Sequence, residues 1–471
     1  MSTFSGLNTA WTGLTAAQRG LETAGQNIAN VNTEGYTRQR VETAAAGAPA
    51  QVGRLSLSGG QAGSGVTVTD IARLNDAQLD ARVRSTAAAA GQSSAAAQGL
   101  SQIEDILREP GQGGLSELLS EYWQSWEEVA AEPGGQPPAA VLIANGQAAA
   151  DRLNRMHGEL TSQYSSQYSV LTSHVDEVNS AAASVAELNR QISTQQAAGG
   201  SANELMDQRD QLTTRIAELT GAEVRTSPNG TADVLIGGTA LVEGSSSRSL
   251  EVSGTGRLSD AETPGITWAH RSAGADAVSI TGGEIAGGLT LLGSAEDGGR
   301  IASAAAAMDA IAVDLAGRVN SAQAAGVTVS GEPGAAFFTL DDDNPAASLN
   351  VAVTDAAQLA TGTAGQGPLD GSNAARIVEF GEAPGGPDEM WRTFAAQVGA
   401  DVRQASSASV NASTAHVSAT EAQRSHSGVS LDEENMALLT HQHAYQGAAR
   451  VMTAVDQMLD TLINRTGVVG R

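Results

Sequence analysis

Apolar residues recur every seven positions near the N-terminus of the chain. The series consists of Leu7, Leu14, Leu21 and Ile28, accompanied three positions along by Ala10, Ala17 and Ala24. This spacing is the a/d pattern of a coiled-coil helix, continued through about three to four heptads. Gly6, Gly13 and Gly20 occupy a further heptad position beside it. Each glycine costs an isolated helix about 1 kcal/mol, but in this row the glycines allow a neighbouring helix to approach closely.

The C-terminal region carries a matching heptad pattern. Its members are Leu431, Leu438, Tyr445, Met452 and Leu459, with Ala448, Val455 and Leu462 as their d partners. Ser430 and Glu433 have the spacing of a capping box, and the acidic run 432–434 suits the positive end of a helix dipole. We call the fifteen heptad positions at the two ends the seam residues. We predict that they pair with each other, with other subunits, or with both.

Between the two ends, helical and β-like patterns alternate. A third heptad series runs from Tyr164 to Ile192, and further helices are expected over Ala202–Thr220 and Arg300–Gln323. Short apolar runs among Gly, Ser and Asn-Gly turns predict strands from Ala222 to about Thr290. A final helix is expected from near Glu389 towards Arg424, with a possible interruption.

These elements predict a multi-domain α+β fold: a discontinuous helical bundle of N- and C-terminal coiled-coil helices with inserted β-rich segments. The predicted parts are a terminal coiled-coil assembly domain (1–45 and 425–471), a mainly helical inner domain (46–221, 300–340 and 388–424), a β-rich segment (222–299) and a small outer insertion of strands and loops (341–387).

Composition narrows the function classes. The 471 residues include 52 acidic and 26 basic side chains and no cysteine, and every basic residue is an arginine. Thiol nucleophiles, thiolate metal sites, lysine Schiff bases and a Walker P-loop are therefore excluded. The net charge of −26 repels phosphate backbones, so we expect no nucleic-acid partner. No apolar run approaches the length of a membrane span, and the first basic residue is Arg19, so neither a membrane partner nor a Sec-type leader is expected.

Candidate catalytic and ligand residues have simpler explanations. His441 and His443 lie about 200° apart on a helix and cannot share a metal. The acidic run 341–344 lacks the spacing of a calcium loop, and adjacent glutamates at 127–128 and 433–434 point in different directions. Trp123 and Trp126 suit a buried anchor better than a ligand pocket. We therefore predict no catalytic residues, no cofactor and no metal: the chain is not expected to be an enzyme.

A motif after the first helix carries a family resemblance. The run Asn27-Ile-Ala-Asn-Val-Asn-Thr-Glu-Gly-Tyr-Thr-Arg-Gln39 resembles the N-terminal motif of the bacterial flagellar axial proteins, which include rod, hook and hook-associated proteins. Its motif residues in this chain are Asn27, Asn30, Thr33, Gly35 and Tyr36. The asparagines and Gly35 are also the residues expected to end a helix before an extended segment.

Further segments are similar to the hook-associated members of that family. In chain order they are 115–133 with its Tyr-Trp-Gln-Ser-Trp core, 202–212, 283–289 followed by the 300–323 helix, 334–340, and 427–445. Residues 340–387 show no family pattern, which leaves any role of an outer domain open.

The resemblance implies a secreted structural adaptor at the junction between the flagellar hook and filament, exported through the flagellar type III apparatus. The partners it implies are copies of the chain in a ring or helical assembly, the hook protein, the second hook–filament junction protein, and a flagellar export chaperone with the export apparatus. Hook, rod and second junction proteins stay open as alternatives within the family. A secreted adhesin and a glycan hydrolase are the alternatives from other classes.

Overall fold

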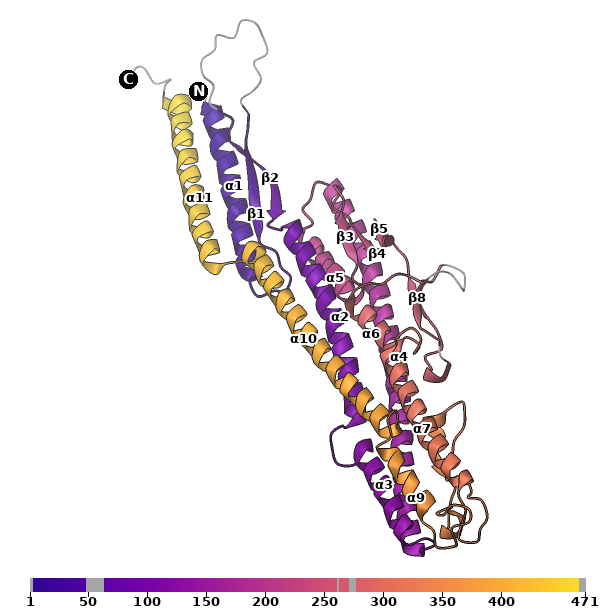
Figure 1. Ribbon diagram of the computed structural model, residues 1–471. Helices are drawn as coiled ribbons and strands as arrows, with labels where there is room; N and C mark the ends of the chain where they lie inside the picture. The colour runs from indigo at the N-terminus through magenta and orange to yellow at the C-terminus, as the bar shows by residue number, and fades with distance from the viewer. Residues whose placement is uncertain (1–2, 48–62, 261, 271–276, 466–471) are drawn as a thin grey trace.

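The computed structural model describes residues 3–47, 63–260, 262–270 and 277–465. The molecule is elongated, with the start of α1 and the end of α11 at one end and α3 and α9 at the other (Figure 1). Long helices dominate and small antiparallel sheets flank them, so the predicted α+β class is confirmed.

Two helices far apart in the sequence form one end of the molecule. Helix α1 (Thr3–Ala29) lies antiparallel to α11 (Leu431–Asp460), and a short π-helical turn, η4 (Thr461–Arg465), follows α11. We call α1 and α11 the terminal pair. Strands β1 (Gln39–Ala45) and β2 (Val66–Arg73) form an antiparallel ribbon that runs along α1 (Figure 1).

The rest of the molecule is built on long helices that we call the shaft. They are α2 (Ala77–Leu107), α4 (Gln136–Ala197), α5 (Asn203–Thr220), α6 (Gly283–Leu292), α7 (Arg300–Ala325) and α10 (Pro387–Ser427). Helix α4 has 62 residues and therefore runs for about 90 Å. Helix α10 is continuous, so no interruption occurs in the helix expected before Arg424.

An aromatic cluster closes the core at the end of the shaft remote from the terminal pair. Helix α3 (Leu115–Ala131) contributes Tyr122 and Trp126, and their rings lie 5.7 and 5.6 Å from that of Phe337. Trp126 is fully buried and Trp123 nearly so, as predicted for an anchor. Trp123 also donates a hydrogen bond from Nε1 to Asp388 Oδ2 at the start of α10, at 2.8 Å.

The strands beyond β2 are short and lie beside α4. One sheet has the order β3 (Glu223–Thr226), β4 (Ala232–Ile236), β5 (Thr239–Glu243) and β6 (Ser246–Ser247). Strands β7 (Leu250–Ser253) and β8 (Gly265–Trp268) form a second pair, separated in the chain by the 3₁₀ turn η1 (Leu258–Asp260). Alternation of buried Ala232, Val234 and Ile236 shows why β4 forms: one face of the strand packs on the core.

Two predicted β segments are partly wrong. Residues 283–292, expected within the β-rich stretch 222–299, form α6, because Ile285, Leu289 and Leu292 recur at helical spacing and pack on the shaft. In 341–387 the only strand among the described residues is β10 (Asn350–Val351), paired with β9 (Phe338–Thr339). The remaining elements of this segment are α8 (Pro345–Ser348), η2 (Ala356–Gln358), α9 (Ser372–Val378) and η3 (Glu379–Gly381).

Candidate functional site

The glycine row of α1 faces α11. A β-carbon built on Gly6 would lie 3.7 Å from Val455 Cγ2, and one on Gly13 would lie 4.0 Å from Ala448 Cβ. On Gly20 it would lie 2.4 Å from Nδ1 of His441, so the imidazole ring occupies the space that a side chain would need. The predicted close approach of a neighbouring helix is confirmed, and His441 serves in helix packing.

The structure separates the seam residues by exposure. Ala10, Ala17, Ala24 and Val455 are buried within the terminal pair. Those that are only half-buried are Leu7, Leu14, Leu21, Ile28, Leu438, Ala448, Met452 and Leu459. Those that face solvent are Leu431, Tyr445 and Leu462, with 47%, 38% and 54% of their surface exposed. Pairing within one chain therefore uses only part of the apolar seam.

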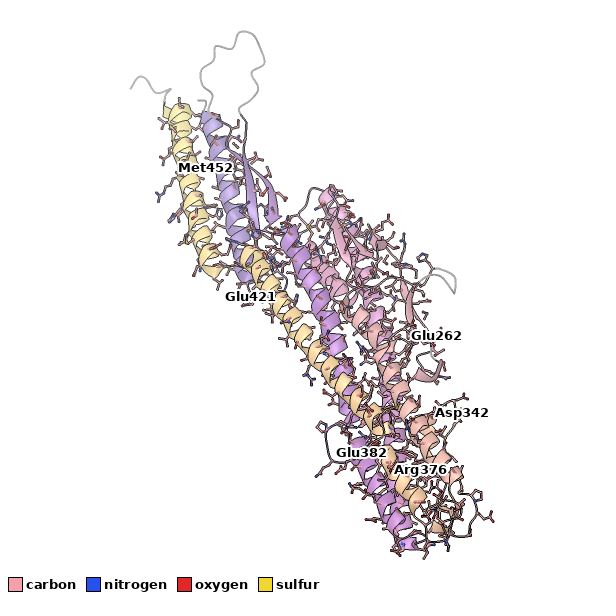
Figure 2. The ribbon with its side chains drawn as sticks, viewed as in Figure 1. Glu262, Asp342, Arg376, Glu382, Glu421 and Met452 are labelled. Atoms are coloured by element: carbon pink, nitrogen blue, oxygen red, sulfur yellow. The ribbon has the colours of Figure 1, made fainter. Side chains whose placement is uncertain are left out.

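Exposed apolar side chains are concentrated on the terminal pair and η4. Nine of the fifteen large exposed hydrophobic residues in the described ranges lie there. Besides the three exposed seam residues they are Trp11, Met436, Leu439, Val451, Met458 and Ile463, which sequence analysis missed because they lie off the heptad register. Figure 2 shows this end of the molecule, with Met452 labelled on α11. Apolar surface gathered in one place marks an interaction site.

Asn27 is the centre of a buried hydrogen-bond cluster at the base of the terminal pair. Its Oδ1 accepts hydrogen bonds from the Tyr36 hydroxyl at 2.9 Å and the Gln39 backbone N–H at 3.0 Å. Its Nδ2 donates to the Gln39 carbonyl at 2.9 Å and to Glu434 Oε2 of α11 at 3.0 Å. One amide therefore joins α1, the loop after it and α11.

The other motif residues shape that loop. Asn30 Nδ2 donates to the Gln26 carbonyl at 3.0 Å, and the Thr33 hydroxyl donates to Asn30 Oδ1 at 3.1 Å. Gly35 has a φ of +74°, and a β-carbon there would lie 1.9 Å from Gln211 Nε2. The backbone angle requires glycine at this position, and the Gln211 side chain of α5 occupies the space beside it.

Arg38 and Gln39 extend the cluster. Arg38 forms an ion pair with Glu433 and a second one from Nε to Glu434 Oε1 at 2.6 Å, while its backbone N–H donates to the Ser427 carbonyl. The predicted capping box at 430–433 is wrong: the Ser430 side chain makes no cap hydrogen bond, and Glu433 pairs with Arg38 instead. The family motif contained both residues, but nothing in the sequence assigned them a partner in α11.

One face of α5 forms hydrogen bonds with the motif loop and with strands β1 and β2. This polar face consists of Asn203, Glu204, Asp207, Asp210 and Gln211, which share one side of the helix. Asn203 donates to the Ile71 carbonyl, Gln211 donates to the Glu34 carbonyl, and Glu204 Oε1 accepts from Gln39 Nε2. We call these contacts, together with the Asn27 cluster, the joint.

In the joint, Arg73 of β2 faces two carboxylates of α5. Arg73 Nη1 is 3.2 Å from Asp207 Oδ1, and its Nη2 is 2.6 Å from Asp210 Oδ2. Asp207 Oδ2 also accepts the Thr37 backbone N–H at 3.1 Å. Burial raises the pKa of Asp207, and Arg73 opposes that rise. Burial, with the carboxylates of Glu204, Asp207 and Glu434 adding to it, also raises the pKa of the Tyr36 hydroxyl well above its usual value.

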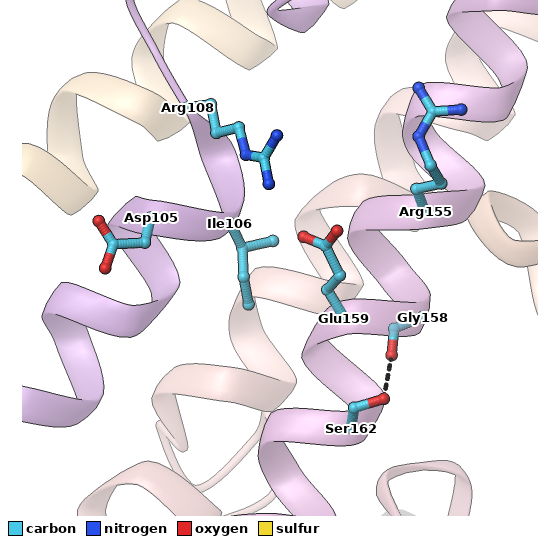
Figure 3. A pocket seen from close by; sticks show the side chains of 7 residues that line it. All are labelled: Asp105, Ile106, Arg108, Arg155, Gly158, Glu159 and Ser162. Carbon is cyan, nitrogen blue, oxygen red and sulfur yellow. Dashed lines mark hydrogen bonds between the residues drawn. The ribbon is translucent and has the colours of Figure 1, made fainter.

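One surface cavity of the shaft combines two arginines with a glutamate. A shallow cavity of about 500 Å³ lies between α2 and α4, where Arg108 and Arg155 stand on either side of Glu159 (Figure 3). Its one hydrogen bond between lining residues runs from the Ser162 hydroxyl to the Gly158 carbonyl, so the serine is not activated by a base. Within residues 3–47, 63–260, 262–270 and 277–465, no group of three metal-ligating side chains comes together.

The same described residues contain no helix with the length and apolar character needed to cross a membrane.

Family models match three parts of the chain. Residues 100–338 match the "Flagellar hook-associated protein FlgK helical domain". Residues 7–37 match the "Flagella basal body rod protein" family, and residues 424–465 match the "Flagellar basal body rod FlgEFG protein C-terminal" family. The two rod-type matches fall on the two helices of the terminal pair and on the motif loop.

Individual relatives agree with these matches. Flagellar hook-associated protein 1 of Bacillus subtilis (strain 168) is 30% identical over 517 aligned residues, which cover 100% of both chains. Its namesake in Escherichia coli (strain K12) is 30% identical over 247 residues, covering 52% of this chain and 44% of that protein. The solved structure of the flagellar hook junction protein FlgK from Burkholderia pseudomallei shares the fold, with a TM-score of 0.63 and 16% identity over 75% of this chain and 100% of that one.

Proposed function

Because the chain belongs to the family of flagellar hook-associated protein 1, we propose that it is the adaptor subunit that joins the hook to the filament of a bacterial flagellum. Membership of this family gives the chain a structural role in the flagellar axis. The finer assignment rests on one observation: the terminal pair presents apolar side chains, such as Trp11, Leu431 and Tyr445, that a single chain leaves exposed to water.

The partners that we propose follow from that surface and from the family. Copies of the same chain bury the exposed seam residues in a ring or helical assembly. The hook protein contacts one side of that assembly and the second hook–filament junction protein contacts the other. An export chaperone and the type III export apparatus deliver the chain to a secreted, extracellular position at the junction. The proposed role is structural, without catalysis.

A rod or hook protein is the second candidate, because rod-type family models match both helices of the terminal pair. The match over residues 100–338 favours the hook-associated role, since it covers the helical part between those ends.

Deletion of the gene tests the proposal. Electron microscopy of the deleted strain is expected to show hooks without filaments, and the culture medium is expected to contain free flagellin. Cells without hooks would move the protein inward to the rod or hook. Cells with normal filaments would overturn the flagellar proposal.

Complementation of that strain tests the seam. Leu14→Asp and Met452→Asp each place a charge where a neighbouring subunit has no partner for it, so filaments are expected to be lost although the protein is still exported. Asn8→Asp, an exposed position of α1 outside the seam, is the matched control and should restore filaments. Normal filaments on cells with Leu14→Asp would contradict the assignment of the seam.

A further inference from the structure

We propose that Met436, Met452 and Met458 of α11 are oxidation sites that control assembly: hydrogen peroxide converts them to methionine sulfoxides, and the oxidised chain no longer joins its neighbours. This rests on the proposed function, because the three side chains belong to the surface that neighbouring subunits are proposed to cover. It adds regulation by a small oxidant to a surface so far described only by its apolar character.

The sulfur atoms of the chain are distributed unevenly between the shaft and the terminal pair. The sequence has eight methionines and no cysteine, so thioethers are its only sulfur groups. Met1 lies outside the described residues, and three of the other seven methionines lie on α11. Met436 and Met458 of α11 are 70% and 51% exposed. Those of the shaft are fully buried (Met156 and Met308) or half-buried (Met206 and Met390).

Met436 and Met458 lie on one outward face of α11. They are about six helical turns apart, which leaves them about 40° apart around the helix axis. The exposed side chain of Val451 lies within about 60° of Met436 on the same face. Met452 is half-buried and lies on the other side, which packs on α1 through Val455. Sulfur therefore occurs both on the outward face of α11 and on its seam.

A methionine thioether and hydrogen peroxide react without a further reactant. The sulfur lone pair attacks one peroxide oxygen, a sulfur–oxygen bond forms, and the oxygen–oxygen bond breaks. The departing hydroxide takes up the proton of the transferred oxygen and leaves as water, so sulfur is oxidised and peroxide is reduced. Because the oxidant must reach the sulfur, exposed methionines react before buried ones. This order favours α11 over the core of the shaft.

Oxidation changes the polarity of α11 at the places where we propose that a neighbour packs. A sulfoxide is polar and accepts hydrogen bonds, whereas the thioether that it replaces is apolar. A neighbouring subunit that covers the sulfoxide with apolar groups leaves its oxygen without a partner, which is costly. The oxidised chain is therefore expected to keep a folded shaft and to lose association.

The contrast between α11 and the shaft does not depend on pairing of α11 with α1. Met156 and Met308 belong to the apolar core of the shaft, which includes no described side chain of either terminal helix. Their protection therefore persists when the terminal helices separate. Separation of α11 from α1 exposes Met452 as well, and leaves the order of reactivity between the two parts unchanged.

Peptide mass spectrometry of the full chain tests the order of reactivity. The purified chain is treated with hydrogen peroxide, quenched and digested at successive times. Sulfoxide is expected to form at the three α11 methionines on the order of tenfold faster than at Met156 and Met308. Equal rates at the two sets of methionines would overturn the inference, and this measurement is independent of the proposed function.

Binding to hooks isolated from the deletion strain tests the consequence. Untreated chain is expected to sediment with the hooks, and peroxide-treated chain is expected to bind at least about tenfold less. Methionine sulfoxide reductases of both epimer specificities, with dithiothreitol as reductant, should restore binding. The chain has no disulfide on which the dithiol could act, so recovery reports on methionine.

Leucine variants assign the effect to α11. The triple variant Met436→Leu, Met452→Leu and Met458→Leu keeps apolar side chains of similar volume without sulfur, and should bind hooks before and after peroxide treatment. The matched control, Met206→Leu with Met390→Leu, replaces the half-buried methionines of the shaft and should lose binding after treatment as the wild-type chain does.

The outcomes separate this inference from the proposed function. Undiminished binding of the oxidised wild-type chain, or loss of binding in the peroxide-treated triple variant, would overturn the inference and leave the proposed function in place. If the triple variant fails to bind before treatment, the reductase experiment decides, and binding that does not return with reduced methionine would overturn the inference. Untreated wild-type chain that does not bind hooks would contradict the proposed function, and the inference with it.

Discussion

The terminal pair and the shaft are both built from heptad-patterned helices, but they differ in how much of the pattern is used. In α4, Leu171, Val178 and Val185 of its heptad series are buried against neighbours from the same chain. In α11, the seam residues Leu431 and Tyr445 remain exposed although their spacing is the same. The comparison teaches that a heptad pattern predicts burial without indicating whether the partner belongs to the same chain.

The number of neighbours explains the difference. Helix α4 is surrounded by α2, α3, α5, α6 and α7 and by the strands beside it, whereas α11 packs on α1 and continues into η4. A helix with one neighbour can bury one stripe, and the rest of its apolar face stays in water until another subunit covers it. The same sequence pattern therefore serves folding in the shaft and association in the terminal pair.

Two tryptophans give the largest expected contrast between the regions. Trp126 is fully buried in the aromatic cluster of the shaft, and Trp126→Ala should lower the free energy of unfolding by about 3–5 kcal/mol. Trp11 is 58% exposed on α1, and Trp11→Ala should change it by no more than about 0.5 kcal/mol. Urea unfolding of both variants measures the difference, and equal losses would contradict the distinction between the regions.

The hydrogen-bond centre at the base of the terminal pair should give the next largest effect. Asn27→Ala removes the buried partner of the Tyr36 hydroxyl, the Gln39 N–H and the Oε2 atom of Glu434, which should cost about 2–3 kcal/mol. Amide hydrogen exchange should show the loss in α1 and α11 while the shaft stays protected. Asn8→Ala, an exposed asparagine of the same helix, is the control, and equal exchange in both variants would count against a central role for Asn27.

Substitution of two glycines of α1 distinguishes the effect of helix propensity on stability from the effect of close helix packing. Gly13→Ala meets Ala448 at an ordinary contact distance and should stabilise the terminal pair by about 1 kcal/mol, because alanine favours helices. Gly20→Ala places a methyl group against the His441 ring and should lose that gain, since the ring must move. Helicity of the terminal pair during urea unfolding distinguishes the two, and stabilisation by Gly20→Ala would show that the helices are free to separate.

The smallest expected effect is a pH dependence at the joint. Because burial raises the pKa of Asp207, the folded chain holds that proton more tightly than the unfolded chain, whose aspartate titrates near 3.8. The associated stability is present below the unfolded pKa and is lost as the pH rises through the folded pKa. Asp207→Asn lacks this titration, so the wild-type chain should lose stability relative to the variant between acidic and neutral pH. Parallel urea curves across that range would contradict this.

Local patterns predicted most helices, and failed where a residue's partner is distant. The heptads indicated the helices at both ends, and the glycine row indicated their close approach. Glu433 was assigned to a cap because its nearest partner in sequence was Ser430, but it pairs with Arg38, 395 residues away. Nothing in the sequence indicated the hydrogen bond between Asp207 and Thr37, which are 170 residues apart.

The prediction for the short helix α6 was wrong for a different reason. Its ten residues include three glycines, whose low helix propensity favoured a prediction of strand and turn. Packing of Ile285 and Leu292 in the shaft core outweighs that propensity, and this packing depends on neighbours from α2, α4 and α7. Intrinsic propensity is a weak guide wherever tertiary burial decides the outcome.

The antiparallel contact of α1 with α11 also has a consequence for the order of events during synthesis. Asn27 and Glu434, which close the base of this contact, are 407 residues apart, so α1 is made long before its partner exists. The shaft can bury its core while α1 still lacks α11, because that core includes no described side chain of either helix. The terminal contact is therefore the last to close, and a chain cut short before residue 431 would hold a finished shaft beside an unmatched first helix.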